Sequence, residues 1–350
     1  MIGELNQIAP LPGDPQPIVI IGTGGIVRDA HLPAYTKAGL PIAGLFDPDR
    51  ARAQALAEEF GGLKVFETLE KAAAQQAVFD VAAPAGAHVD ILNALPHGAA
   101  VLLQKPMGLD LAHATRIRDA AHARGQISAV NFQLRHSPMM RALADAIARG
   151  WLGALTEIEV HLNLVTPWHL FPHLKRDPRV EIVSHSIHYL DTIRALAGEP
   201  QGVFARSFGH PDSDLSDTRT SILLDYPAPL RVALSINHHH DFGRRFQDAA
   251  FRVEGTQGAA MVKLGLLLDY PVGEPDELWI TRKGGDWQQV PLQGRWFPDA
   301  FLGPMGNLQR FVAGEDARLH TALDDAWRTM ALVEACYAAA RQPSFPIPQP

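Results

Sequence analysis

The sequence contains a single cysteine, Cys336, among its 350 residues. One thiol cannot form an internal disulfide, and it excludes the zinc modules that need several cysteines. The sequence also has no apolar run close to the roughly 20 residues that a membrane-spanning helix requires. We therefore expect a protein of a reducing compartment and predict a cytoplasmic location.

An excess of positive charge is also absent. The formal net charge is −7 and the sequence pI is near 6.1, so no basic field attracts nucleic acid or an anionic membrane. Residues 1–17 contain no lysine or arginine and thus lack the charged region of a secretory signal. We expect residues 1–16 to be a loose leader and the partner to be a small molecule, not nucleic acid or a membrane.

Hydrophobic residues make up 47% of the chain, which is enough for two domains with cores. In the first part, short apolar segments alternate with helical ones, a pattern typical of a parallel, doubly wound sheet. After Asn131 the apolar segments follow one another directly, which predicts an α+β domain with a largely antiparallel, open-faced sheet. The expected strands are 18–21, 42–46, 64–66, 78–82, 101–103 and 127–130, then 155–165, 221–226, 230–236, 249–253 and 278–281.

A glycine-rich turn follows the first expected strand. A buried strand, a glycine turn and a helix start form the context of a Rossmann dinucleotide fingerprint. Gly22 would make the tight turn, and Gly24 would let the backbone approach a pyrophosphate held by helix amides. Val27 stands where the fingerprint has a third small residue, so an ordinary glycine turn is the alternative. The predicted cofactor-binding residues of this turn are Gly22, Thr23, Gly24, Gly25, Ile26 and Val27.

The second expected strand ends in Asp47. A carboxylate there accepts hydrogen bonds from ribose hydroxyls and repels a 2′-phosphate, which favours NAD over NADP. Arg52 lies close behind and could pair with that phosphate, so NADP is the less favoured alternative. Asp47 could instead only cap the helix that follows.

Two further strand ends point to the same edge of the sheet. Proline disfavours the α region for its predecessor, so Lys105, before Pro106, should be a positioned amine at the end of a buried strand. Pro84 and His88 follow the neighbouring strand and would contact the nicotinamide half of the cofactor. The alternatives are a surface lysine in a loop and an ordinary histidine in the first turn of a helix.

In the second domain one predicted helix carries a polar stripe. Ser184, His188 and Asp191 fall at i, i+4 and i+7 and therefore share a face. An imidazole on such a stripe can face a cleft, although a purely structural histidine is the alternative.

Together these motifs resemble the glucose–fructose oxidoreductase, inositol dehydrogenase and MocA (Gfo/Idh/MocA) family. The glycine turn with His31-Leu32-Pro33-Ala34 is similar to the family's opening, and Gln104-Lys105-Pro106 to its Glu-Lys-Pro motif. His188 and Asp191 match its Asp-x-Gly-x-His-x-x-Asp helix, and residues 307–337 resemble its C-terminal helix. The resemblance implies an NAD(P)-dependent dehydrogenase that oxidises a secondary alcohol of a sugar, polyol or sugar acid.

The same resemblance implies roles for individual residues. His188 would be the base. Lys105, which would also contact the cofactor, would stabilise negative charge on the alcohol oxygen or relay the proton itself. Gln104, beside the cofactor, and Ser184 replace two carboxylates of the family pattern, and His185 could compensate for the second. The predicted substrate-binding residues are Lys105, Trp168, His169, Arg176, Ser184, His185 and His188.

The resemblance also sets the expected domains and assembly. We expect a Rossmann domain at 1–131, a substrate and oligomerisation domain at 132–310, a helix at 311–342 that packs back on the Rossmann domain, and a proline-rich tail at 343–350. A homodimer or homotetramer is expected. We predict no metal, because the triplet 238–240 lacks carboxylate or cysteine partners at a characteristic spacing. A glycosidase or lyase that retains NAD, or a sugar-sensing regulator of this fold, remains the alternative function.

Overall fold

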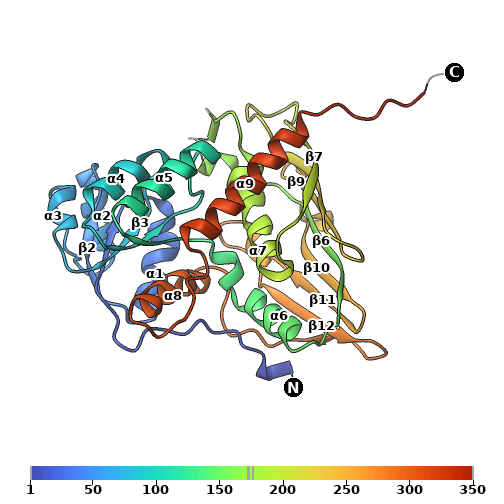
Figure 1. Cartoon of the computed structure of the whole chain (residues 1–350), viewed down its shortest axis with the longest axis horizontal. Coiled ribbons are helices and arrows are strands. Elements are labelled where there is room, and N and C mark those ends of the chain that lie inside the picture. Colours follow the sequence, from blue (N-terminus) through green and yellow to red (C-terminus); the bar gives the residue numbers. More distant parts are fainter. Residues whose placement is uncertain (1, 172–173, 176, 349–350) are drawn as a thin grey trace. The chain divides into compact units, whose positions relative to one another are not determined.

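The computed structural model describes residues 2–171, 174–175 and 177–348, which divide into two units (Figure 1). Unit 1 comprises Met1–Ala146 and Pro291–Met330, and unit 2 comprises Ile147–Val290 and Ala331–Pro350. Residues 291–310, which we expected in the second domain, therefore group with unit 1. Among the described residues, no helix has the length and apolar content needed to cross a membrane.

A five-stranded parallel sheet forms the centre of unit 1, with the strand order β2-β1-β3-β4-β5. This arrangement confirms the predicted doubly wound sheet. Residues 64–66, expected as a strand, make only a single bridge beside β2, where Leu45 donates to the Lys64 carbonyl and Phe66 donates to the Leu45 carbonyl. The strands are β1 (Ile18–Ile21), β2 (Ile42–Phe46), β3 (Val78–Val81), β4 (Ala100–Leu103) and β5 (Ile127–Val130).

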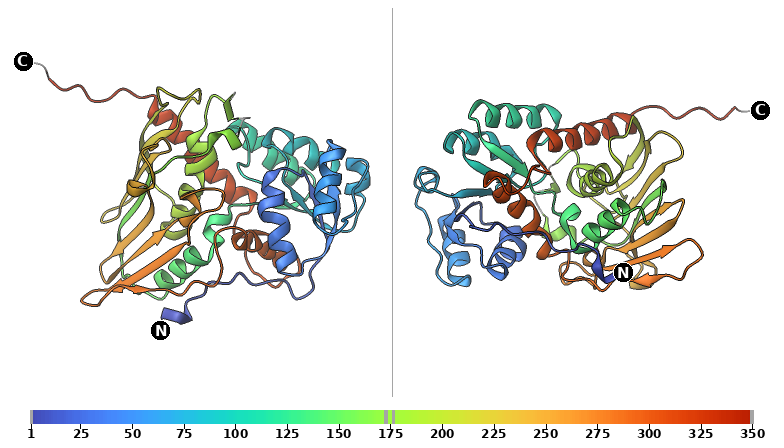
Figure 2. Two further views of the ribbon diagram at one scale, coloured as in Figure 1. Left: turned by 180° about the vertical axis from the view of Figure 1, so that it is seen from behind. Right: turned by 60° about the horizontal axis from the view of Figure 1, so that its bottom comes forward.

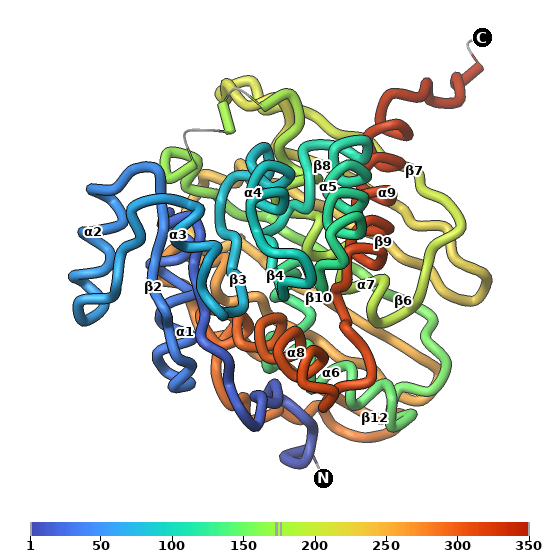
Figure 3. The backbone as a smooth tube through the Cα atoms, turned by 60° about the vertical axis from the view of Figure 1, so that its left-hand side comes forward, coloured from blue at the N-terminus to red at the C-terminus, as the bar shows by residue number. Residues whose placement is uncertain are grey.

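Helices cover both faces of this sheet. Residues of α1, α2 and α8 share one hydrophobic cluster with Ile18, Ile20 and Leu102. On the other face α3 contacts α4, and α4 lies beside α5 (Figure 3). Aspartate and threonine side chains cap several of these helices by accepting a backbone N–H of the first turn: Asp49 caps α2, Thr68 caps α3 and Asp110 caps α5. The helices are α1 (Leu32–Lys37), α2 (Arg50–Glu59), α3 (Leu69–Ala73), α4 (His88–Ala94), α5 (Leu111–Ala123), α6 (Pro138–Ala148) and α8 (Leu302–Val312).

Hydrogen bonds hold the N-terminal segment, which we expected to be loose, to the rest of unit 1. The Gln7 side chain donates to the carbonyl of Pro291 at 3.1 Å, and Gly13 donates to Glu315 at 3.0 Å. The backbone N–H of Gln16 donates to the Gln309 side chain of α8 at 2.8 Å. The segment therefore runs beside α8 and leads directly into β1.

Unit 2 is built on an eight-stranded sheet with the order β13-β12-β11-β10-β6-β9-β8-β7 (Figure 2). Only β6 and β9 pair in parallel, so the prediction of a largely antiparallel sheet is confirmed. Strands β7, β11 and β13 were not predicted. The strands are β6 (Leu155–Asn163), β7 (Gly202–Phe208), β8 (Arg219–Asp225), β9 (Arg231–Asn237), β10 (Asp248–Gly255), β11 (Gly258–Lys263), β12 (Glu277–Arg282) and β13 (Gln288–Gln289).

Side chains alternate along these strands between a buried and a more exposed face. Ile158, Val160 and Leu162 of β6 are buried, and α7 (Ile187–Ala197) contacts this strand. A π-helical turn, Ile182–Ser186, leads into α7. A long helix, α9 (Leu323–Ala340), spans the boundary between the two units along the chain.

Candidate active site

The glycine turn after β1 lies at the point where the strand order of unit 1 reverses. Gly22 has φ = 96°, and a Cβ there would lie 2.8 Å from backbone atoms of Ala82. A side chain is excluded because the ends of β1 and β3 are neighbours. A Cβ on Gly24 would meet no atom within 4 Å, so the turn is open on the side where a pyrophosphate would approach. These features fit a dinucleotide.

The helix after the turn begins with a π-helical segment, Val27–His31. Val27 is fully buried in the core of unit 1, and its N–H donates to the Gly24 carbonyl at 3.0 Å. Its side chain therefore replaces the fingerprint's third glycine as a packing residue. A cofactor contact at Val27 is limited to the backbone.

Asp47 lies at the end of β2 and is almost fully buried. Its carboxylate accepts hydrogen bonds from the N–H and hydroxyl of Thr23 at 2.8 and 3.0 Å, and from Arg52 at 2.7 Å. Burial acts to raise the pKa of Asp47, but the hydrogen bonds from Arg52, Asp49 and Thr23 outweigh it and lower that pKa. The ionised side chain ties the glycine turn to β2. The capping alternative for Asp47 is wrong, because Asp49 caps α2.

The loop after β3 contains two further candidates, of which Pro84 is exposed. His88 has no exposed surface, and its ring nitrogens lie 3.2 Å from the Met107 carbonyl and 3.1 Å from the Ala83 carbonyl. Burial lowers its pKa to about 4, so the ring is neutral at pH 7. A neutral ring has one N–H and therefore donates to only one of these two carbonyls. Because His88 has no exposed surface, the nicotinamide contact expected of it is corrected to a structural role between the loop after β3 and the segment after Lys105.

Lys105 follows the end of β4, as predicted. Its backbone N–H donates to the side-chain oxygen of Gln104 at 3.0 Å, while the Gln104 N–H continues the ladder to Val81. Desolvation lowers the pKa of the Lys105 amine to about 8. An amine with that pKa can give up or take a proton near neutral pH, which suits a role in acid–base or charge-stabilising chemistry.

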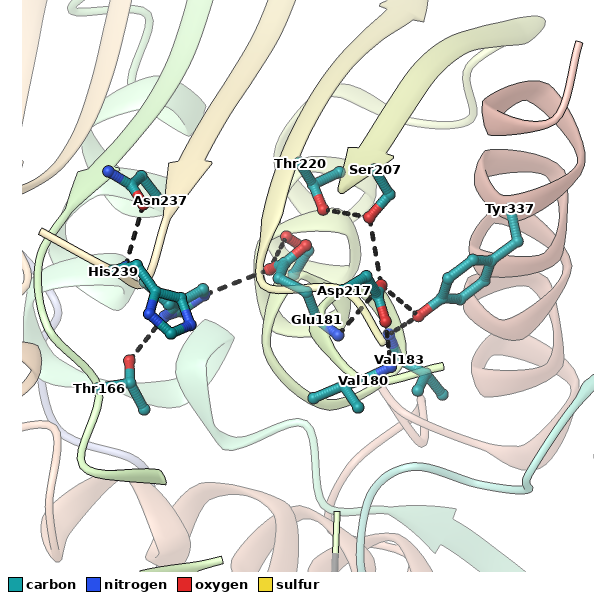
Figure 4. A network of polar contacts seen from close by, with 12 residues as sticks. Thr166, Val180, Glu181, Val183, Ser207, Asp217, Thr220, Asn237, His239 and Tyr337 are labelled. Carbon is teal, nitrogen blue, oxygen red and sulfur yellow. Dashed lines mark hydrogen bonds and ion pairs between the residues drawn. The ribbon is translucent and has the colours of Figure 1, made fainter. Parts of the chain in front are cut away.

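In unit 2, Asp217 holds the beginning of the helix that carries the polar stripe (Figure 4). Its carboxylate accepts the backbone N–H of Val180 at 2.7 Å and that of Glu181 at 3.3 Å. The hydroxyls of Ser207 and Tyr337 also donate to it, at 3.2 and 3.3 Å. These bonds fix the helix start from β7 and α9 and thereby set the position of the candidate residues that follow.

We expect Asp217→Asn to lower the free energy of unfolding by about 1–3 kcal/mol, because the amide offers one acceptor oxygen where the carboxylate offers two. Urea denaturation followed by circular dichroism measures the difference. Asp212→Asn is the matched control, since the Asp212 side chain is 90% exposed and the change should stay within about 0.5 kcal/mol. Equal stability of both variants would show that the cap contributes nothing.

The structure brings several of the predicted substrate-binding residues together. The rings of Trp168 and His185 are 5.1 Å apart and edge-on, and both are partly exposed. Ser184 is half-buried beside His185, and His188, one turn further on, is 7% exposed. His169 points to solvent in an exposed position, and Arg176 lies outside the described residues. Trp168 and His185 therefore form an aromatic wall on the side of the polar stripe.

Of the two residues that lie beside this wall, Glu181 was missed in the sequence, and His238 was considered there as part of the histidine triplet. Glu181 is fully buried, accepts a hydrogen bond from Ser186 at 2.7 Å and lies 3.5 Å from Nε2 of His238. The His238 ring lies 4.8 Å from that of His185, and its Nδ1 is 2.7 Å from the Thr166 hydroxyl. The Glu181 carboxylate thus lies one helical turn before Ser184. In the family motif a carboxylate stands at the position of Ser184 itself. The signal available in the sequence was the glutamate at position 181.

The other groups near the histidine triplet are already engaged. His239 stacks on His210 with ring centroids 4.4 Å apart, and no group of three side chains within the described residues is arranged to hold a metal ion. Arg244 pairs with Glu274 at 2.7 Å, and hydrogen bonds from Arg244 and Lys263 lower the Glu274 pKa to about 2. Arg244 is therefore already paired with a carboxylate.

The chain is similar to known proteins over most of its length. Residues 17–132 match a family model described as an oxidoreductase family with an NAD-binding Rossmann fold, and residues 140–261 match the GFO/IDH/MocA C-terminal domain. A D-apiose dehydrogenase of Paraburkholderia graminis is 26% identical over 92% of this chain and 87% of that protein. An inositol 2-dehydrogenase of Burkholderia lata is 26% identical over 93% of each chain. The solved structure of an oxidoreductase from Agrobacterium radiobacter, in complex with NAD+, L-tartaric acid and magnesium, superimposes with a TM-score of 0.77 at 19% identity, over 93% of this chain and 96% of that one.

Proposed function

This chain belongs to the GFO/IDH/MocA family of oxidoreductases, and we propose that it oxidises a secondary alcohol of a sugar, polyol or sugar acid. The observation that carries the proposal is Lys105, an amine with a lowered pKa at a strand end of the sheet whose glycine turn fits a dinucleotide. The names of the relatives, which include apiose and inositol dehydrogenases, support the substrate class. A cytoplasmic location, expected from the single cysteine, is part of the proposal.

Oxidation of an alcohol requires that a hydride leave the carbon while a base removes the hydroxyl proton. Bound NAD(P) would supply the hydride acceptor. The backbone of the glycine turn would hold the pyrophosphate, and Asp47 the adenosine ribose. Lys105 would stabilise the negative charge that develops on the alcohol oxygen. His188 would take the proton, and Trp168 and His185 would offer an aromatic face and a polar edge to a sugar ring.

We expect NAD to bind about tenfold more tightly than NADP, because the ionised Asp47 would meet the 2′-phosphate with a like charge. Calorimetric titration with each cofactor measures the ratio. Asp47→Asn should bring the affinities for NAD and NADP closer together. Asp49→Asn, which changes only the side chain that caps α2, should leave the ratio of the two affinities unchanged. A clear preference for NADP would mean that Arg52, now paired with Asp47, reads the ribose phosphate instead.

The substrate class is tested by following NAD(P)H absorbance during a screen of sugars, polyols and aldonic and uronic acids. Turnover of a neutral sugar or polyol supports the proposal directly. Saturable sugar binding without any turnover would favour the sugar-sensing alternative, and release of a free sugar from a glycoside would favour the hydrolytic one.

We also propose that unit 2 mediates a homodimer or homotetramer through the more exposed face of its sheet. Phe204 of β7 and Leu223 of β8 are directly paired across the strands and are 69% and 50% exposed. Phe208, four residues after Phe204 and on the same face of β7, is 56% exposed. An apolar surface of this kind on a sheet is typical of a protein–protein contact.

A further inference from the structure

A buried polar cluster lies directly behind Gln104 and Lys105 in unit 1. Its members lie in the π-helical segment Val27–His31, in α1, in β3 and directly after β4 and β5, and none is more than 8% exposed: His31, Tyr35, Asp80, Gln104 and Asn131. Nδ1 of His31 lies 2.6 Å from an oxygen of Asp80, and the Tyr35 hydroxyl donates to the same oxygen at 2.8 Å. Burying polar groups this deeply is costly unless they are paired. The second carboxylate oxygen of Asp80 and the side-chain oxygen of Asn131 have no hydrogen-bond partner among the described residues.

The contacts determine which atoms of His31 carry a proton. The Asp80 oxygen that accepts the Tyr35 hydroxyl also faces Nδ1 of His31, so we place the proton of this contact on Nδ1. The side-chain oxygen of Gln104 already accepts the Lys105 N–H, so the Gln104 amide nitrogen is the atom that faces Nε2 of His31, at 3.5 Å. The Asn131 amide nitrogen faces the same Nε2 at 3.4 Å, and the Phe301 ring packs against the imidazole at 4.9 Å. With two amide nitrogens directed at it, Nε2 is placed as the acceptor, and Nδ1 as the nitrogen that carries the ring proton.

We propose that His31 and Asp80 are positioning residues for Lys105, and that Gln104 is the link through which they act. His31 accepts from the Gln104 amide, which leaves the Gln104 oxygen directed at the Lys105 N–H. Both the nitrogen and the oxygen of the Gln104 amide are thus held by contacts. The contact to the Lys105 N–H in turn holds the backbone from which the lysine side chain projects. The functional part of this proposal rests on the proposed role of Lys105.

The cluster distinguishes sharply between two substitutions of similar size at position 104. A glutamate can accept the Lys105 N–H but cannot donate to His31, so the imidazole has to take up a second proton and donate from Nε2. A methionine can neither accept nor donate, so the Lys105 N–H loses its partner. In Gln104→Glu, Lys105 should therefore keep its position while His31 gains a positive charge. In Gln104→Met, Lys105 should shift from its position.

The placement of the proton is tested by NMR of the full chain labelled with 15N-histidine, with the His31 signals identified by their loss in His31→Gln. Wild type should show the signature of a neutral imidazole protonated at Nδ1. Gln104→Glu should show an imidazole protonated at both nitrogens. A wild-type ring protonated at Nε2, or at both nitrogens, would overturn the proposal.

Steady-state kinetics test the positioning role. Displacing the lysine by less than 1 Å should lower kcat about tenfold and change KM less. We expect this loss of kcat in Gln104→Met, whereas Gln104→Glu should retain most of the wild-type kcat. Equal losses in the two variants, or a rise in the Kd for NAD with kcat unchanged, would contradict the proposal. If wild type oxidises no sugar, the proposed function fails, and the NMR result still decides whether the cluster is arranged as described.

Discussion

Replacing Lys105 with alanine should lower turnover by a factor of ~10² or more, the usual scale of acid–base and charge-stabilising contributions. Cofactor binding should change little, because the glycine turn and Asp47 hold their positions through contacts that do not include Lys105. Turnover is measured by NADH absorbance and cofactor affinity by calorimetry. Lys71→Ala is the matched control: Lys71 is an exposed lysine of α3 in the same unit, and its loss should leave turnover unchanged. Unchanged turnover in Lys105→Ala would remove this residue from the mechanism.

The pH dependence shows in which form the lysine acts. If the ammonium form stabilises the developing alkoxide, turnover should fall as pH rises through about 8, the lowered pKa of Lys105. Lys105→Arg keeps the positive charge at every accessible pH, so it should retain part of the activity and lose the falling limb. A complete loss of activity in Lys105→Arg would show instead that the amine itself relays the proton.

The residues that fix the fold of unit 1 could be read from the sequence because they act locally. A buried β-branched strand, a glycine turn and an aspartate at the end of the next strand were all recognisable, and the strands β1 and β2 formed where expected. What could not be read is the π-helical turn at Val27–His31, because its register depends on packing against the core. The N-terminal segment was also expected to be loose, since its hydrogen bonds join it to residues about 280 to 300 positions away.

The strands missed in unit 2 have clear physical reasons. In β7, Phe204 and Phe208 lie on the more exposed face, so the apolar pattern indicates the wrong side of the sheet. In β11, glycine and alanine begin a strand that tertiary pairing with β10 and β12 stabilises despite low β propensity. A single sequence contains no record of either pairing.

The candidate site shows the same division. Lys105, Asp47 and the helix with His188 were found from short motifs, whereas Glu181 was not, because its partners Ser186 and His238 become visible only in the folded chain. His88 was given a cofactor role by its place after a strand, yet its ring nitrogens face the backbone carbonyls of Ala83, in its own loop, and of Met107, in the segment after Lys105. Sequence motifs therefore locate the candidate residues, and the folded structure shows which of their polar atoms already contact other groups of the protein.

His188→Asn should abolish the rise of turnover with pH on the acid side of the profile. An imidazole accepts the hydroxyl proton only when neutral, so alcohol oxidation should increase through the range in which imidazoles ordinarily titrate, around pH 6.5. Asparagine preserves much of the polar shape but cannot take up a proton. We expect turnover to fall by a factor of ~10² or more, with the loss largest above pH 7.

The neighbouring histidine supplies the control for this experiment. His185 lies in the π-helical turn before α7, packs edge-on against Trp168 and is more exposed than His188. His185→Asn should weaken substrate binding, seen as a higher KM, and leave the acid limb in place, because its ring belongs to the aromatic wall. If the limb instead disappears in His185→Asn and persists in His188→Asn, the base is His185, and the serine at 184 has been compensated by the residue beside it. If both variants keep the limb, neither imidazole accepts the proton, and the acid–base role passes to Lys105.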